Sequence, residues 1–198
     1  MKIEVVAYNP EWPVIFNHIK NDLKTILGEL NPKIEHVGST SVPNLAAKPI
    51  IDIAVGIDSA DDLDRTVEPM IQNRYIYYET YNAMMPYRRF FVGLKNKEDH
   101  VKFKNVYTQD DPIPHESIHL NKQCHVHIWE FKSPEWHRHI AFRDYLLEHP
   151  EVRKQYEALK KALSLNNWKD GNEYNDGKNS FIKREEEKAV KWWRDKKI

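Results

Sequence analysis

The stretch that decides the fold is HVGSTSVPNLAAKPIIDIA, residues 36–54. It begins within a short apolar run, residues 34–37, which predicts a strand that ends at Gly38. A hydroxyl-rich turn follows, and a second apolar run, residues 50–57, predicts another strand. Asp52 is the single carboxylate inside that second run. Because a buried carboxylate is costly unless it is hydrogen-bonded, paired or bound to a metal, Asp52 marks the place where we expect chemistry.

The turn between these two strands suits a phosphate group. Gly38 lets the backbone turn tightly, and the hydroxyls of Ser39, Thr40 and Ser41 add donors beside the backbone amides. A strand, a Gly-Ser turn and an Asp on the next strand resemble the palm of the nucleotidyltransferase superfamily. That superfamily places a second carboxylate two residues after the first, and the pair holds the catalytic magnesium ions. In this chain the second position is Ala54.

Taken whole, the stretch resembles the GrpB family, a branch of that superfamily which also has a single Asp here. Six further blocks follow the family's order and extend the resemblance over roughly residues 4–190: YNPEW (8–12), RRFF (88–91), HVHI (125–128), FRDYL (142–146), YEALKKAL (156–163) and GKNSFI (177–182). The resemblance implies an α/β (α+β) fold. We expect a nucleotidyltransferase-like palm with a mixed β-sheet over residues 1–132, followed by a C-terminal helical region over residues 133–198.

Length and composition set further bounds. A chain of 198 residues with 40% hydrophobic residues predicts one domain, or one domain with a helical extension. The formal net charge of +0 does not favour a nucleic-acid partner, and no apolar stretch reaches the roughly 18 residues of a membrane span. Cys124 is the only cysteine, and the first residues lack the apolar core of a signal peptide, so we expect a cytoplasmic protein. The oligomeric state stays open.

Other patterns predict the elements around this centre. We expect an amphipathic helix that starts at Asn9-Pro10 and ends between Gly28 and Pro32. Ser59 is the expected N-cap of a helix over residues 61–73. Further strands are expected at residues 75–80, 88–94 and 125–131, with a long loop or insertion at residues 95–124. In the helical region we expect a loop at residues 166–176 and a last helix from about Asn175.

His125 and His127 are two residues apart on a predicted strand, so they share a face. In the palm that the chain resembles, a later strand lies beside the Asp strand and often supplies a third carboxylate; here histidines occupy that stretch. We therefore expect Asp52, His125 and His127 to bind a divalent metal. Magnesium or manganese is implied by the resemblance, and the imidazoles make zinc the alternative. His127 could also act as a general base. The structural alternative is a pair of histidines that serve only packing and hydrogen bonding.

Several cationic residues could bind phosphate. Candidates are Lys48, Arg88, Arg89 and Lys178, with Lys160 on the helical side. Neighbouring residues on a strand point to opposite faces, so only one of Arg88 and Arg89 can face the site. The alternative for each is a solvated surface charge.

A rival motif lies at His115-Glu116-x-x-His119, which matches the signature of zinc peptidases. Against it, Lys122 stands where the longer motif needs glycine, and no methionine follows His125. Two prolines just before His115 also leave little room for a preceding helix. We therefore interpret the match as chance and keep a zinc-dependent hydrolase as the third hypothesis.

Two function classes remain. The resemblance implies a protein that binds a nucleotide or a phosphorylated small molecule between the palm and the helices. As an enzyme it would transfer a nucleotidyl or phosphoryl group to an acceptor, with Asp52 and His127 as catalytic residues. The second class is a binding or accessory module that kept the pocket and lost catalysis, which Ala54 favours.

Overall fold

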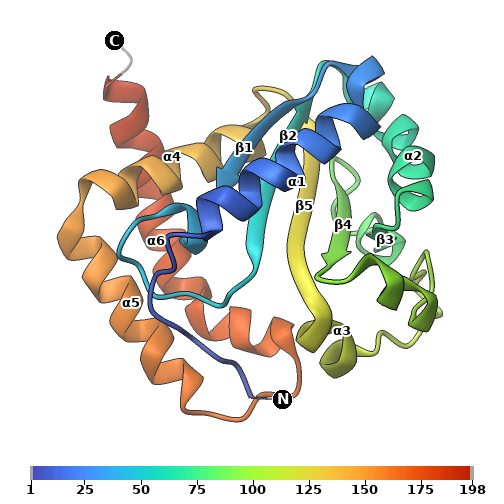
Figure 1. Cartoon of the computed structure of the whole chain (residues 1–198). Helices are drawn as coiled ribbons and strands as arrows, with labels where there is room; N and C mark the ends of the chain where they lie inside the picture. The colour runs from blue at the N-terminus through green and yellow to red at the C-terminus, as the bar shows by residue number, and fades with distance from the viewer. Residues whose placement is uncertain (1, 197–198) are drawn as a thin grey trace.

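A computed structural model describes residues 2–196, and its centre is one mixed β-sheet with helices on both faces (Figure 1). The strands are β1 (Lys33–Val37), β2 (Ile51–Ile57), β3 (Ile76–Tyr77), β4 (Arg89–Leu94) and β5 (Lys122–Glu130). Their order across the sheet is β1-β2-β5-β4-β3. β5 runs parallel to β2, and the other neighbouring strands pair antiparallel. Two strands far apart in the sequence therefore form the middle of the sheet.

The helices are α1 (Trp12–Ile26), α2 (Val67–Gln72), α3 (His115–Asn121), α4 (Pro134–Glu148), α5 (Pro150–Ser164) and α6 (Gly171–Lys196). α1 crosses one face of the sheet, α4 and α5 lie beside the β1 edge, and α6 runs behind the sheet from near α3 toward that edge, as Figure 1 shows. Within residues 2–196, every helix is too short or too polar to cross a membrane.

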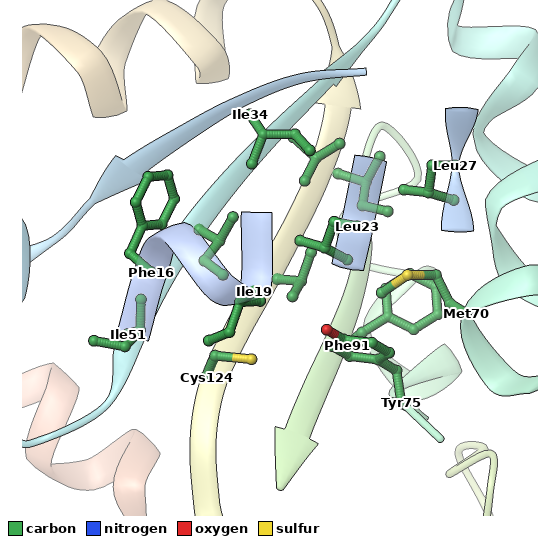
Figure 2. Packing of buried hydrophobic residues seen from close by; sticks show 14 of the residues in the cluster. Phe16, Ile19, Leu23, Leu27, Ile34, Ile51, Met70, Tyr75, Phe91 and Cys124 are labelled. Atoms are coloured by element: carbon green, nitrogen blue, oxygen red, sulfur yellow. The ribbon is translucent and has the colours of Figure 1, made fainter. Parts of the chain in front are cut away.

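The face of the sheet under α1 is the main hydrophobic core (Figure 2). Alternate residues of the two central strands point into it: Ile51, Ile53, Val55 and Ile57 from β2, and Cys124, Val126 and Ile128 from β5. α1 contributes Phe16, Ile19 and Leu23 at helical spacing. Because side chains alternate along a strand, the residues between them, including Asp52, point to the opposite face.

The opposite face is covered only in part. Trp136 and Ile140 of α4 pack on Val37, Ala54 and Trp129 of the sheet. Further along, α5 and α6 pack on the connection between β1 and β2 through Tyr156 and Phe181, which contact Val42 and Leu45. The remaining part of this face is the wall of a polar cavity.

One predicted helix start and one predicted helix type differ from the structure. α1 begins at Trp12 rather than at Asn9-Pro10, and the Asn9 side chain accepts a hydrogen bond from the Glu11 amide at 2.9 Å. The helix expected over residues 61–73 is a 3₁₀ helix, Ala60–Thr66, followed by α2. Pro69 lacks an N–H and fits only the first turn of an α-helix, so α2 cannot begin much earlier. The Ser59 cap is confirmed by its bond from the Asp61 amide at 3.2 Å.

The last helix also begins earlier than predicted. α6 starts at Gly171, within the stretch expected to be a loop. Asp170 accepts hydrogen bonds from the amides of Asn172 at 2.8 Å and Glu173 at 3.0 Å, which are the bonds of an N-cap. This correction matters for the site, because Tyr174 and Lys178 then lie one turn apart on the same face of a helix.

The segment expected to be a long loop, residues 95–124, is more ordered than predicted. It contains a 3₁₀ helix, Lys97–Lys102, and α3, and β5 already begins at Lys122. β3, by contrast, covers only Ile76–Tyr77 of the strand expected over residues 75–80. The edge of the sheet beside β4 is therefore built from short turns and α3.

Candidate functional site

The site is centred on a hydrogen bond between the two middle strands. The parallel register of β2 and β5 places Asp52 opposite His125, and His125 Nδ1 lies 2.8 Å from Asp52 Oδ1. Burial and the nearby charge of Lys122 lower the pKa of His125 to about 4. The ring is therefore neutral at pH 7, and its Nδ1–H donates to the carboxylate. The lone pair of His125 Nε2 therefore takes no part in the bond to Asp52.

The Asp52 carboxylate stays ionised. Burial by itself would raise the pKa of Asp52, but the hydrogen bond from His125, with a smaller contribution from the positive charge of Lys48, holds it below its ordinary value. Gly38 lies directly against this carboxylate with a φ of 70°, and a Cβ at that position would collide with Asp52 Oδ2. The glycine is therefore required both by its backbone conformation and by the close approach of the turn.

His127 has a different partner. Its Nδ1 lies 3.3 Å from Nη1 of Arg88, and its ring stacks on Trp129 with a centroid distance of 5.3 Å. Burial and the charge of Arg88 lower the pKa of His127 well below its ordinary value. Because a guanidinium can only donate, Nδ1 accepts this bond and the proton of the neutral ring sits on Nε2. His127 is thus arranged as a donor toward a ligand.

Asp52, His125 and His127 are the only cluster of three His, Cys, Asp or Glu side chains within residues 2–196 that could hold a metal ion. Each offers a ligand atom, and these atoms lie within 4.8 Å of one another. One carboxylate and two imidazoles suit manganese or zinc better than magnesium, which prefers oxygen ligands. Asp52 and His125 fit the ion as they stand. His127 could use Nδ1 as a ligand only after Arg88 has released it.

The position of the missing second carboxylate is closed by packing. Ala54 points to the same face as Asp52 and lies opposite His127 in the register of β2 and β5. It is fully buried among apolar side chains that include Trp129 and Ile140. A carboxylate at this position would be desolvated against these apolar side chains, with His127 and Glu35 as its cross-strand neighbours, so a second acid is disfavoured here.

Lysines surround the carboxylate. Lys48, Lys160 and Lys178 line one cavity of about 260 Å³ together with Asp52, and we call it the lysine lobe. Burial is the main cause that lowers the pKa of Lys160 and of Lys178 to about 7, and repulsion from Lys48 adds to both shifts. Even with Lys160 and Lys178 about half protonated at pH 7, the three lysines leave a moderate excess of positive charge over the one carboxylate in a sheltered space. Such a space favours an anion that carries several charges.

Two tyrosines hold these lysines. Lys48 and Lys178 both lie over the ring of Tyr174, each 4.6 Å from its centroid. Lys160 lies 4.6 Å from the centroid of Tyr156 and donates a hydrogen bond to the carbonyl of Ala46. Cation–π contacts of this kind orient an ammonium without neutralising it.

The hydroxyl turn contributes less than the sequence suggested. Ser39–Ser41 forms one 3₁₀ turn, and Gly38, Ser39 and Thr40 line the lysine lobe. Ser41 lies outside the lining, because its hydroxyl donates to the carbonyl of Gly38 at 2.6 Å. The Thr40 hydroxyl is bonded to His36 Nε2 at 2.9 Å. The Ser39 side chain is hydrogen-bonded to Tyr156, which also lines the lobe, so all three hydroxyls of the turn already have partners.

The structure separates Arg88 from Arg89. Arg88 faces His127, whereas Arg89 Nε donates to Asp64 at 2.7 Å. Asp64 belongs to the 3₁₀ helix that packs on the α1 face, so Arg89 lies on the wrong side of the sheet. Strand alternation turns Arg89 away from the cavity face, so of the two arginines predicted to bind phosphate only Arg88 lines a cavity there.

The zinc-peptidase motif does not form a metal site. α3 carries His115, Glu116 and His119, but Glu116 is exposed and none of the three joins the metal cluster described above. His115 and His119 instead line a second cavity beside the first. The geometry thus supports interpretation of the motif as a chance match.

Sequence reasoning missed three residues of the lysine lobe. Tyr156 lay inside a quoted family block, but an aromatic residue at helical spacing is more often core. Tyr174 lay in the stretch wrongly expected to be a loop. His139 of α4 also lines the lobe, with its ring centroid 6.0 Å from that of His127 and its Nδ1 donating to the Glu135 carbonyl at 2.8 Å. No local pattern distinguished His139 from the other histidines of its helix.

The chain is similar to known proteins over nearly its whole length. The model of the family described as GrpB protein matches residues 2–188. The chain is 35% identical over 191 residues to the UPF0157 protein YqkA of Bacillus subtilis (strain 168); the match covers 96% of this chain and 48%, or about half, of that longer relative. The crystal structure of the conserved protein GrpB from Enterococcus faecalis matches with a TM-score of 0.74 and 33% identity, over 96% of this chain and 99% of that one.

A more distant likeness identifies the fold. The Cid1 poly(U) polymerase, in a crystal structure with MgGTP bound, matches with a TM-score of 0.51 at 12% identity. The match covers 81% of this chain and 44% of that one. The predicted fold, a nucleotidyltransferase-like palm with a mixed sheet, is confirmed.

Proposed function

The chain belongs to the GrpB family, and we propose that it binds a nucleoside triphosphate together with a divalent metal and transfers a nucleotidyl group to a small acceptor. The observation that carries the proposal is the lysine lobe, where three lysines face one ionised carboxylate. A triphosphate has the charge and the length that such a lobe favours. The likeness to a polymerase that binds MgGTP supports a nucleotide ligand.

Different residues of the site would bind the phosphates and the metal. Lys48, Lys160 and Lys178 would neutralise the phosphates, and the Gly38 turn would bring backbone amides close to them. Asp52 and His125 would hold the metal, which when bound withdraws charge from phosphate oxygens. Manganese or zinc suits this donor set best. His127 would donate its Nε2–H to a phosphoryl oxygen.

The proposed transfer balances without a further reagent. A hydroxyl oxygen of the acceptor forms a bond to the α-phosphorus as the bond from that phosphorus to the bridging oxygen breaks. Pyrophosphate leaves with the electron pair of the broken bond, and the hydroxyl proton passes to water. Transfer of the γ-phosphoryl group instead would release a nucleoside diphosphate, so the released product distinguishes the two reactions.

A second candidate is a binding module without turnover. Ala54 favours it, because its apolar surroundings exclude the second carboxylate of the usual pair. Both candidates predict binding of nucleotide, and only the enzyme predicts release of pyrophosphate. An accessory protein without a ligand would show neither.

The first test is thermal stabilisation of the metal-stripped protein by ATP, GTP, CTP and UTP, with manganese, zinc or magnesium added in turn. We expect a rise in melting temperature that needs both metal and nucleotide, because a ligand of the native state stabilises it by mass action. Asp52→Asn should abolish the rise, and Asp58→Asn, an exposed carboxylate just after β2, should retain it. A rise that survives Asp52→Asn would refute the site, and no rise with any nucleotide would refute the ligand.

A further inference from the structure

A second cavity, of about 250 Å³, adjoins the lysine lobe on the β4 side, and we call it the Arg88 lobe. The two lobes share Lys48, Ile50, His125, His127 and Asn175 in their linings. The remaining wall of the Arg88 lobe is largely aromatic or cationic, with Tyr78, Tyr81, Phe90, Arg88, His119 and Lys122. No Asp or Glu of residues 2–196 is part of this lining.

Arg88 lacks the partner that comparable arginines have. Its guanidinium lies 5.1 Å from the ring centroid of Phe90 and 5.9 Å from that of Tyr81, and among residues 2–196 it donates a hydrogen bond only to the neutral His127. Its Nε is buried with no hydrogen-bond acceptor. Arg138, which is also half-buried, instead pairs with two carboxylates, Glu135 and Glu186.

An arginine that stays charged and is held among rings without an anion has unused binding capacity. A guanidinium presents its donors in a planar fork that matches carboxylate or phosphate oxygens. The rings of Tyr78, Tyr81 and Phe90 cluster at centroid distances of 5.5–5.7 Å and form an apolar surface beside that fork. Together they fit a molecule that has an acidic group on a flat body.

The position of the lobe suggests its role. His125 and His127 form the boundary between the lobes, so a group held in the lysine lobe has its reacting end close to the Arg88 lobe. Phosphoryl and nucleotidyl transfer require the attacking and leaving oxygens to lie roughly in line, on opposite sides of phosphorus. With the leaving phosphates among the lysines, the attacking molecule must enter from the other side.

We propose that the Arg88 lobe binds the acceptor, and that this acceptor carries a carboxylate or phosphate on an aromatic body. The proposal rests on the proposed function for the role of acceptor, but the binding itself does not require a nucleotide. Arg88 is the specificity residue that pairs with the acidic group, while the aromatic rings contact the flat part of the molecule.

The test uses benzoate and phenyl phosphate as probes, with benzyl alcohol as the uncharged control, and saturation-transfer NMR on the full chain. We expect both anions to bind and the alcohol to bind at least about tenfold more weakly, since it cannot pair with a guanidinium. The stronger of the two anions identifies which acidic group the lobe prefers. Equal binding of benzyl alcohol and benzoate would overturn the proposal.

Two adjacent arginines supply matched variants. Arg88→Gln should weaken benzoate binding at least about tenfold, and Arg88→Lys should weaken it less, because it keeps the charge and loses the fork. Arg89→Gln, on the other face of the sheet, should bind benzoate as the native chain does. Unchanged binding in Arg88→Gln, with its melting temperature retained, would refute the assignment.

Tripolyphosphate separates this proposal from the proposed function. It should bind in the lysine lobe, be weakened by Lys178→Gln and be unaffected by Arg88→Gln, and benzoate should bind in its presence. Displacement of benzoate by tripolyphosphate would show one shared anion site and overturn the two-lobe proposal. Absence of tripolyphosphate binding, with benzoate still bound through Arg88, would refute the nucleotide function and leave the acidic ligand of Arg88 in place.

Discussion

The two faces of the central sheet use the same strands for different purposes. On the α1 face, Ile53 and Val126 are fully buried in a hydrophobic core of aliphatic and aromatic side chains. On the other face, their neighbours Asp52 and His125 form a hydrogen-bonded pair that is only partly buried, with the Asp52 side chain 33% exposed. A shift of one residue along a strand therefore changes the environment from core to cavity.

Because the two faces differ in this way, residues that stabilise the fold and residues that bind a ligand can be distinguished one by one along each strand. Burial of the α1 face stabilises the fold without contact to the cavity, since side chains alternate across the sheet. The cavity face carries desolvated charges, which cost stability and are retained where a ligand compensates for them. Substitutions on neighbouring residues should thus affect different measurements.

The largest expected effect is that of Asp52→Asn on turnover. Loss of the carboxylate removes the metal ligand and the group that orients His125, so we expect pyrophosphate release to fall by roughly a thousandfold or more. The melting temperature of the free protein should fall modestly, because the lowered pKa of Asp52 means that its contacts stabilise the carboxylate by more than burial costs. Asp58→Asn is the control. Equal rates in the two variants would contradict the role of Asp52.

Ile53→Ala should have the opposite profile. Truncation of a fully buried isoleucine on the α1 face costs about 2–5 kcal/mol of unfolding free energy. Nucleotide affinity measured well below the melting temperature should remain that of the native chain. Urea unfolding and a binding titration on the same sample check both halves, and a loss of affinity without unfolding would show that the two faces are coupled.

Gly38→Ala should lower both stability and ligand affinity, because Gly38 is needed for the backbone turn and also contacts the site. Its φ of 70° and ψ of −172° are almost restricted to glycine, so alanine should cost about 1–3 kcal/mol. The added methyl group would also displace the Asp52 carboxylate and weaken metal-dependent binding. Gly28→Ala is the matched control, since a Cβ there has no atom within 4 Å. Native binding in Gly38→Ala would refute the close contact with Asp52.

The fold and the centre of the site were readable from the sequence because both depend on local order. The Gly-Ser turn, the lone Asp52 in an apolar strand and the two alternating histidines each have a fixed periodicity, and the register of β2 with β5 then brings them together. The register itself explains why Asp52 pairs with His125 rather than with His127. The register between two strands so far apart in the sequence could not be predicted from residue spacing alone.

The rest of the site depends on tertiary contacts that have no sequence pattern. The Asp170 cap moves the start of α6 to Gly171 and so brings Tyr174 between two lysines. The choice between Arg88 and Arg89 required the phase of β4, which a one-residue error reverses. The lowered pKa of Lys160 arises from burial under a helix, and residue type alone does not reveal it.

Without any substitution, we expect a pH dependence with opposite signs for binding and stability. Lys160 and Lys178 have a pKa of about 7 in the folded chain against an ordinary value of 10.5. As the pH rises through 7 the lobe loses positive charge, so affinity for trimetaphosphate, whose own charge is constant in this range, should fall by up to about tenfold per pH unit for each lysine.

The stability of the free protein should move the other way. Between pH 7 and 10.5 the unfolded chain binds more protons at these two lysines than the folded chain does, so their contribution to the unfolding free energy rises with pH and is lost as the pH falls through 7. Lys48 and Asp52 face both ammonium groups, and Glu157 and Lys161 also face Lys160. The double variant Lys160→Met, Lys178→Met should flatten both profiles. Flat profiles around pH 7 in the native chain would mean that these lysines stay fully charged in the free lobe, and parallel slopes would contradict the assignment.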